Sequence, residues 1–221
     1  MNIYEDKRTC AICGTTSKQI IFRSASQYGT DLDTRPGQTM RWTMHTWVQS
    51  CPSCGYCAQD ISKEILQASQ IIESAQYRDQ VNHEDYPELA NYFLCWAIIQ
   101  GAIADYSKAG WGAMYAAWTC DDAEMKSPAI ACRLRAMSLF QEARTRKLPF
   151  AKDAGVEEAI LADLLRRTKQ FELVKKVCTE GLGKKPHEIV RQMLDFQIVL
   201  AERMDEKCYT TDDAQKYTTG R

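Results

Sequence analysis

The chain has 221 residues, of which 45% are hydrophobic and 26% are charged, and its formal net charge at pH 7 is −1. These proportions are typical of soluble globular proteins and exclude a long disordered chain. The near-neutral balance argues against a generic nucleic-acid binder, because such proteins are usually basic overall. A charged N-terminal stretch, and no run of about 18 uncharged apolar residues, predict a cytoplasmic protein that is not embedded in a membrane.

Residues 1–58 predict a small β-rich unit, a zinc ribbon interrupted by a long inserted loop. Residues 18–23 (KQIIFR) and 43–50 (TMHTWVQS) are rich in β-branched and aromatic side chains, as strands are. Residues 24–42 contain Gly, Pro, Asp and Ser, which favour a loop. A loop of this length is uncommon unless it binds something or packs on a neighbour.

Four of the ten cysteines form two CxxCG motifs, CAICG with Cys10 and Cys13 and CPSCG with Cys51 and Cys54. Two intervening residues let a turn present both thiolates to one ion, and the glycine permits a tight turn. A redox centre is less favoured because neither pair lies in a βαβ context, and a disulfide framework because no export signal is recognisable. The spacing predicts one structural Zn²⁺ held by the four cysteines.

Two further side chains near the second pair are candidate ligands. Cys57 repeats the CxxC spacing after Cys54, so it could compete for the ion or belong to a second site. The alternative, which we favour, is a small buried side chain where the ribbon meets the first helix. His45 is the other candidate, although four cysteines already complete a tetrahedron. Four of the remaining cysteines are expected to be buried helix thiols: Cys95, Cys120, Cys132 and Cys178.

From residue 59 to residue 205 the apolar spacing changes to about 3.6, which predicts a helical domain. A first helix is expected from about residue 60, and a second from DYPE (residues 85–88), which has an aspartate cap and a proline in the first turn. Gly110 and Gly112 are expected to separate the second helix from the next. Further helices are expected over residues 127–147, 155–167, 170–182 and 187–204, and the polar tail 206–221 is expected to fray.

The last helices fit one tetratricopeptide repeat of 34 residues when Pro186 is placed at position 32. Small or apolar residues then occupy the positions that pack the two helices of such a repeat: Leu161, Ala162, Leu165, Phe171, Val174, Cys178 and Gly181. Lys169 departs from the pattern because a turn glycine is usual there. One repeat cannot bury its own face, so we expect a mainly α protein in which a tetratricopeptide-like antiparallel helical array follows the ribbon.

Three stretches carry a resemblance to a known family: DLDTRPGQTMRWTMHTWVQSCPSCGYCAQDIS (residues 31–62), YAAWTCDDA (115–123) and SPAIACRLRA (127–136). Through them the chain resembles an uncharacterised prokaryotic family, a domain of unknown function, over about residues 10–140. Members of that family join an N-terminal zinc-ribbon segment to tetratricopeptide-like helices. The resemblance therefore implies the same architecture, and it implies no activity.

The inserted loop and its flank contain polar and aromatic residues that could recognise a partner: Asp31, Asp33, Arg35, Arg41, Trp42 and Trp47. Arginine and tryptophan are frequent anchors for peptides and for nucleic-acid ends. The alternative, which we favour, is that the loop caps the ribbon and docks it on the helices through Asp–Arg bonds.

The sequence favours a non-enzymatic interaction protein that offers a helical surface to a protein or peptide partner. Residues 57–125 hold 11 acidic and 3 basic side chains, and residues 126–191 hold 8 acidic and 15 basic ones, an asymmetry that could steer docking. The alternative is a nucleic-acid-binding ribbon protein that uses the loop arginines, the tryptophans and the basic helices. An enzyme is less favoured, because the acid pair Asp121 and Asp122 is better explained as a solvated helix end or a partner for basic residues.

Overall fold

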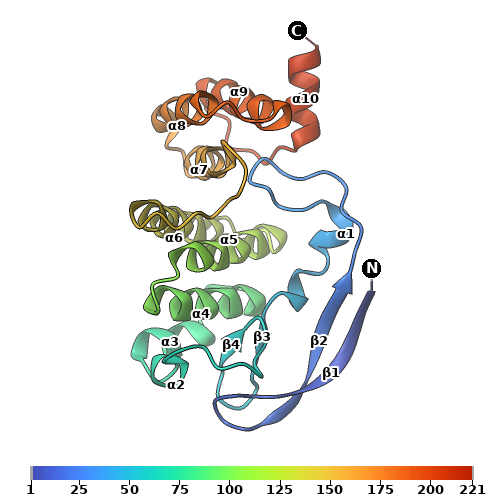
Figure 1. Cartoon of the computed structure of the whole chain (residues 1–221), viewed down its shortest axis with the longest axis vertical. Coiled ribbons are helices and arrows are strands. Elements are labelled where there is room, and N and C mark those ends of the chain that lie inside the picture. The colour runs from blue at the N-terminus through green and yellow to red at the C-terminus, as the bar shows by residue number, and fades with distance from the viewer. Residues whose placement is uncertain (1, 221) are drawn as a thin grey trace. The chain divides into compact units, whose positions relative to one another are not determined.

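The computed structural model describes residues 2–220 and is mainly helical, with two small antiparallel sheets near the N-terminus (Figure 1). It confirms the predicted fold class, a mainly α protein with an N-terminal β part. Contacts divide the chain into two compact units. Unit 1 consists of the residues up to Ser26 and of Trp42–Leu148, and unit 2 consists of Gln27–Arg41 and the residues from Pro149 onward.

Each unit has its own set of helices. The elements of unit 1 are β1 (Asn2–Thr9), β2 (Thr16–Ser24), the 3-10 helix η1 (Met44–Thr46), β3 (Gln49–Ser50), β4 (Cys57–Ala58), α2 (Ala68–Ile71), α3 (Ala75–Val81), α4 (Glu88–Ala102), α5 (Tyr106–Asp122) and α6 (Lys126–Thr145). Those of unit 2 are α1 (Gln38–Arg41), α7 (Val156–Arg167), α8 (Phe171–Gly183), α9 (Glu188–Glu202) and α10 (Thr211–Thr219).

The two units differ from the expected division at residues 58 and 59. Unit 1 combines the cysteine-bearing β segment with helices up to α6, because β4 packs on α4. Unit 2 takes in the inserted segment 27–41, which hydrogen-bonds to the chain just before α10: the Leu32 amide donates to the Tyr209 carbonyl. A change in the type of secondary structure is therefore not a boundary between compact units.

Unit 1 begins with the β1–β2 hairpin, in which Thr9 faces Thr16 beside the first cysteine turn. β3 and β4 form a second, much shorter antiparallel pair. The prediction of a strand over residues 43–50 is wrong except for the last two residues, which form β3. The amides of Thr46 and Trp47 donate to the Thr43 and Met44 carbonyls and turn the chain into η1.

The helix expected from about residue 60 begins later, because residues 60–67 form turns and α2 starts at Ala68. Side chains bind the backbone groups that a helix would need. The Tyr56 hydroxyl accepts from the Ile65 amide and donates to the Lys63 carbonyl. Such local bonds compete with helix formation. The next long helix, α4, begins at Glu88, directly after the proline of DYPE.

Helices α4, α5 and α6 run in succession and pack on one another in unit 1 (Figure 1). Gly110 and Gly112 lie inside α5, so the break expected at these glycines is wrong. The chain breaks before Asp105 instead, whose side chain caps α5 by accepting a backbone amide of its first turn. The glycines permit close packing: a Cβ on Gly110 would lie 2.4 Å from the Phe140 ring, and one on Gly112 would lie 3.0 Å from the Ala97 Cβ.

Unit 2 contains the three helices expected over residues 155–167, 170–182 and 187–204, which are α7, α8 and α9. The apolar positions of the repeat pattern are mostly buried: Leu161, Ala162, Leu165, Val174, Cys178 and Gly181. Arg166 of α7 is also buried, bound to Asp163 at 2.5 Å and to the carbonyls of Asp205 and Lys207. This arginine holds the segment after α9 against α7.

The expectation that the polar tail frays is wrong for Thr211–Thr219, which forms α10. A capping box starts the helix: the Thr210 hydroxyl accepts from the Asp213 amide, and the Asp213 carboxylate accepts from the Thr210 amide. Tyr217 packs on Phe196 of α9, with ring centroids 5.2 Å apart. The capping box and the aromatic contact thus stabilise α10, although the tail lacks the apolar stripe that usually holds a helix against its neighbours.

Six helix ends share one backbone conformation, a non-glycine residue with positive φ at the following turn: Ala104, Glu124, Lys147, Lys169, Lys185 and Met204. At Lys169 φ is 62°, its amide donates to the Arg166 carbonyl, and the Gln170 amide donates to the Leu165 carbonyl. This is the Schellman arrangement, in which glycine is the usual residue. The position where the repeat pattern expects glycine therefore has the backbone that glycine favours.

Candidate metal centre

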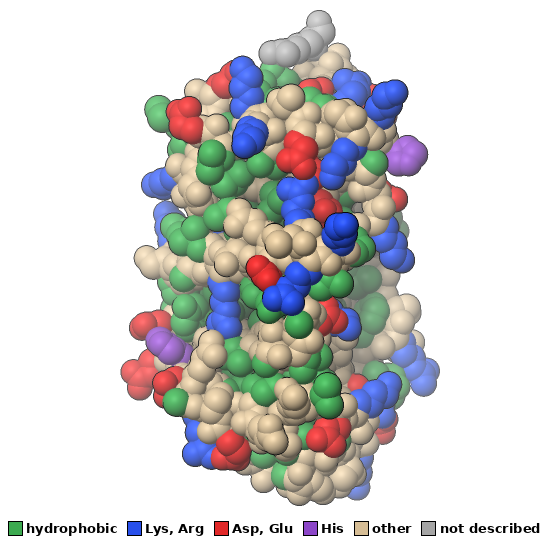
Figure 2. All heavy atoms as spheres, turned by 60° about the vertical axis from the view of Figure 1, so that its left-hand side comes forward, with side chains coloured by type: hydrophobic (Ala, Val, Ile, Leu, Met, Phe, Trp, Pro, Cys, Tyr) green, Lys and Arg blue, Asp and Glu red, His purple; other side chains and the backbone are tan. Residues whose placement is uncertain are grey.

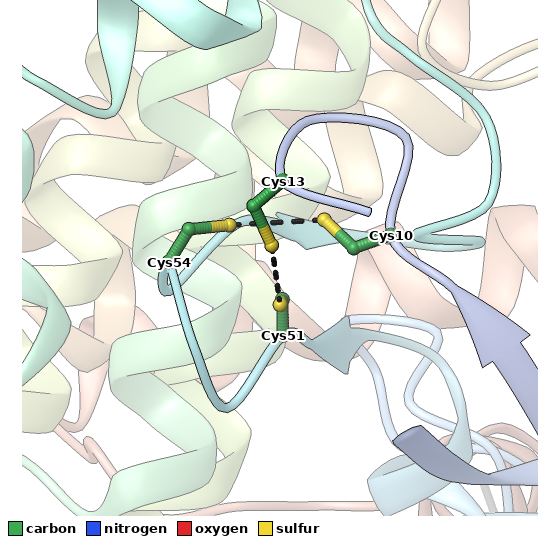
Figure 3. Close-up of side chains that lie close together, drawn as sticks. All are labelled: Cys10, Cys13, Cys51 and Cys54. Carbon is green, nitrogen blue, oxygen red and sulfur yellow. Dashed lines mark hydrogen bonds between the residues drawn. The ribbon is translucent and has the colours of Figure 1, made fainter. Parts of the chain in front are cut away.

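Four cysteine sulfurs meet in unit 1, from the turn between β1 and β2 and from the turn between β3 and β4 (Figure 3). The Sγ atoms of Cys10 and Cys54 lie 3.7 Å apart, and those of Cys13 and Cys51 lie 3.6 Å apart. All four sulfurs lie within 4.8 Å of one another. The two motifs that the sequence paired are thus brought to one point.

The two turns have the same backbone geometry. In the first, the Gly14 amide donates to the Cys10 carbonyl at 2.9 Å, and in the second the Gly55 amide donates to the Cys51 carbonyl at the same distance. The glycines have φ of 73° and 72°, a region that other residues rarely adopt. Each CxxCG motif therefore folds into a turn that points both of its sulfurs to the same side.

The dimensions of the cluster suit a tetrahedral ion with thiolate ligands. Sulfurs about 2.3 Å from a central zinc ion form a tetrahedron with edges of roughly 3.8 Å. The two measured Sγ–Sγ distances, 3.6 and 3.7 Å, are close to that edge. No fourth coordination position is left for water or substrate if all four cysteines bind, which is the arrangement of structural rather than catalytic sites.

The protonation of the thiols differs around the cluster. Hydrogen bonds from the Thr15 hydroxyl and amide lower the pKa of the Cys13 thiol to about 6. Burial raises the pKa of the Cys10 and Cys54 thiols. A cation among the sulfurs would oppose the effect of burial, because coordination favours the thiolate. The four cysteines could therefore hold a metal ion.

The two further candidates for the metal lie outside the group of four. Cys57 is fully buried, its thiol donates to the Gly55 carbonyl at 3.3 Å, and its amide donates to the Tyr77 hydroxyl at 3.0 Å. His45 is exposed. Cys57 thus packs where the second cysteine turn meets α3, as the favoured interpretation expected.

Two residues that support the site were not singled out in the sequence. Thr15 directly follows CAICG and bonds to Cys13. The Tyr77 hydroxyl donates to the Gly55 carbonyl at 2.9 Å and so ties the second turn to α3. Thr15 could have been found from its place beside the motif, but nothing in the spacing points to Tyr77.

The candidate recognition residues of the inserted loop are largely bound within unit 2. Asp31, Asp33 and Arg35 are buried, at 5%, 1% and 4% exposure. Arg41 donates to the Asp31 carboxylate at 2.7 Å and to the Pro36 carbonyl at 3.1 Å. The Arg41–Asp31 ion pair closes the loop on itself, whereas the favoured alternative expected Asp–Arg bonds that dock the ribbon on the helices.

The two candidate tryptophans belong to unit 1 and differ in exposure. Trp42 is 62% exposed, whereas Trp47 donates from Nε1 to the Thr43 hydroxyl and packs edge-on against Tyr115. Trp42 is therefore the one exposed side chain among the six candidate residues.

The acid pair at the end of α5 contributes to packing. Arg133 of α6 is 2% exposed, and its two terminal nitrogens contact both carboxylate oxygens of Asp121. Asp121 is thus a partner for a basic residue. The thiols of Cys95, Cys120, Cys132 and Cys178 are buried, as expected for helix packing.

Comparisons with protein-family models, with curated proteins and with solved structures give no match to this chain. Over the described residues, every helix is too short or too polar to cross a membrane.

Proposed function

We propose that this chain is a cytoplasmic, non-enzymatic zinc protein that uses its helical surface to bind a protein or peptide partner. The observation that carries the proposal is that the Cys10, Cys13, Cys51 and Cys54 sulfurs lie within 4.8 Å of one another. Four thiolates are a preferred ligand set of Zn²⁺ in structural sites. We also propose that the chain belongs to the uncharacterised prokaryotic family that it resembles, whose members join such a site to tetratricopeptide-like helices.

The proposed role of zinc is to hold short β segments together. β3 and β4 each contain two residues, and the β1–β2 hairpin is an isolated two-stranded sheet. Such sheets are marginally stable without further support. One ion bound to both cysteine turns would join the hairpin to the segment that packs on α4, so that metal binding would contribute directly to folding.

The helices are the proposed surface for a partner. Figure 2 shows charged side chains of both signs spread among hydrophobic ones on one face of the molecule. Mixed surfaces of this kind suit protein partners, whereas nucleic-acid binding depends on concentrated positive charge. Arg35 is buried and Arg41 is bound to Asp31, so two residues that motivated the nucleic-acid alternative are engaged inside the protein.

The proposal is tested by affinity purification of the tagged full chain from native lysate, without chelator. We expect specific protein partners to be recovered by the wild type and to be lost with Cys54→Ser, which removes one zinc ligand. Cys208→Ser is the matched control, because Cys208 is exposed and outside the cluster. Recovery of no specific protein, together with salt-sensitive binding to single- or double-stranded nucleic acid, would contradict the proposal and favour the alternative.

A further inference from the structure

A cavity of about 600 Å³ opens on unit 1 between α2, α3, α4, α5 and α6. Its apolar lining includes Ile71, Ala97, Ile98 and Leu139. Polar groups surround this lining, among them the side-chain amides of Gln67, Gln70 and Gln76. Figure 2 brings the side of unit 1 that carries α2 and α3 forward, where hydrophobic side chains are exposed between polar ones. The volume and the mixed lining are those of a ligand pocket.

Arg135 of α6 is the only charged side chain among the described residues that line this cavity. It is partly buried, and its Nη1 lies 3.5 Å from Gln80 Oε1, a long contact with a neutral group. Within residues 2–220 no carboxylate pairs with it. Arg133 and Arg166, in contrast, are each bound to an aspartate.

This lack of a counter-ion has an energetic consequence. Burial lowers the pKa of the Arg135 guanidinium, so the surroundings disfavour its charge. A partly desolvated guanidinium offers a planar set of donors that matches a carboxylate, and such charged hydrogen bonds strengthen in a low dielectric. The cavity is therefore complementary to an anion that carries a single negative charge.

The residues that line the cavity limit the class of anion that could bind there. Nucleic acid is a poor candidate, because Arg135 is the one basic side chain among the described lining residues. Apart from Arg135 and Leu139, the lining comes from residues 57–125, which hold 11 acidic and 3 basic side chains. A peptide suits the lining better, since glutamine side chains can bind peptide N–H and C=O groups. The C-terminal residue of a polypeptide carries both a carboxylate and a side chain on one Cα. The cavity has a group to match each of them, an arginine for the carboxylate and an apolar lining for the side chain.

We infer that this cavity binds the C-terminus of a partner polypeptide, with its carboxylate on Arg135 and an apolar last side chain against Ala97, Ile98 and Leu139. The inference rests on the proposed function and specifies which surface and which part of the partner are used. The glutamines of α2 and α3 would hold the preceding peptide bonds.

The test uses the zinc-loaded full chain and a random-peptide library displayed with free C-termini. We expect selected peptides to end in an apolar residue. Synthetic versions of these peptides are then titrated as free acids and as C-terminal amides. We expect amidation to weaken binding by about tenfold or more, because a charged hydrogen-bonded pair is lost. In Arg135→Met the free acid should bind as weakly as the amide does to the wild type, and amidation should have no further effect.

Matched variants separate this result from a loss of folding. Arg78→Met removes an exposed arginine of α3 that pairs with Glu73 and does not line the cavity, so it should bind like the wild type. Ala102→Trp fills the exposed rim of the cavity and should abolish binding with unchanged circular dichroism. Equal binding of acid and amide, selection of no peptide, or full binding by the Ala102→Trp variant would overturn the inference.

A parallel lysate capture distinguishes failure of this inference from failure of the proposed function. If Arg135→Met and Ala102→Trp recover the same specific proteins as the wild type, the cavity is not the docking site, and the interaction function stands. If the wild type recovers none, the interaction function fails as well.

Discussion

The Sγ atoms of Cys10 and Cys54 lie 3.7 Å apart, although 44 positions separate them in the sequence. The contact joins the first hairpin to the turn that precedes β4, and β4 packs on α4. Cys13 and Cys51 make the second cross-connection at 3.6 Å. Both links cross between the two turns, so an ion at their centre would join two parts of unit 1 rather than close either turn alone.

The glycine in the first cysteine turn should be required for its conformation. Gly14 has φ of 73°, and a Cβ there would meet no atom within 4 Å. We therefore expect Gly14→Ala to destabilise the protein by about 1–2 kcal/mol through backbone strain alone. Gly55→Ala should cost more, since its Cβ would also lie 3.3 Å from Val81. Urea unfolding measures both, and Gly183→Ala, in open space without positive φ, should change stability little.

Replacing Lys169 by glycine at the end of α7 should increase the stability of the protein. Lys169 has φ of 62°, which costs a residue with a Cβ about 1 kcal/mol, and its ion pair with Glu206 is exposed and worth little. Lys169→Gly is therefore expected to raise the unfolding free energy by about 1 kcal/mol. Lys176→Gly, on the exposed side of α8, should lower it by a similar amount. A loss of stability in Lys169→Gly would contradict the assigned backbone.

The ion pair between α5 and α6 should be important for stability. Asp121→Ala leaves the Arg133 guanidinium buried without its carboxylate partner, and we expect a loss of about 3 kcal/mol in chemical denaturation. Glu142→Ala breaks an exposed pair between α6 and its C-cap residue Arg146, and it should shift the unfolding midpoint far less. Similar losses in the two variants would show that Arg133 does not depend on Asp121.

The capping box of α10 should depend on pH. Hydrogen bonds from the Thr210 amide and hydroxyl lower the pKa of Asp213 below its ordinary value of 3.8. The cap is therefore fully effective above about pH 4 and is lost as the pH falls through the lowered folded-state value. Amide NMR signals of α10 should show fraying in that acidic range, and Asp213→Asn should show it already at neutral pH. A pH-independent α10 would contradict this account.

The cysteine cluster and the principal helices of both units could be predicted because their determinants are local. CxxCG specifies a turn, and an apolar repeat of 3.6 specifies a helix face, regardless of the rest of the chain. The α10 cap was also local, since Thr210 and Asp213 have the capping-box spacing, but the lack of an apolar stripe concealed it.

Other features depend on partners far away in the sequence. Leu32 in the inserted loop bonds to Tyr209, and no pattern near residue 32 indicates that contact. Gly110 favours a helix break in the sequence because glycine is a poor helix former, but tertiary packing against Phe140 outweighs that propensity. Arg135 resembles any other helix arginine in the sequence, and only the structure shows that it lines a cavity and that no carboxylate within residues 2–220 pairs with it.

The central claim is that the four cysteines bind zinc, and metal analysis of the full chain purified without chelator tests it most directly. We predict about one zinc per chain in the wild type and in Cys208→Ser, and its loss in Cys54→Ser together with unfolding of the β segments. Protein that contains no zinc, or a Cys54→Ser variant that retains the wild-type amount, would contradict the account.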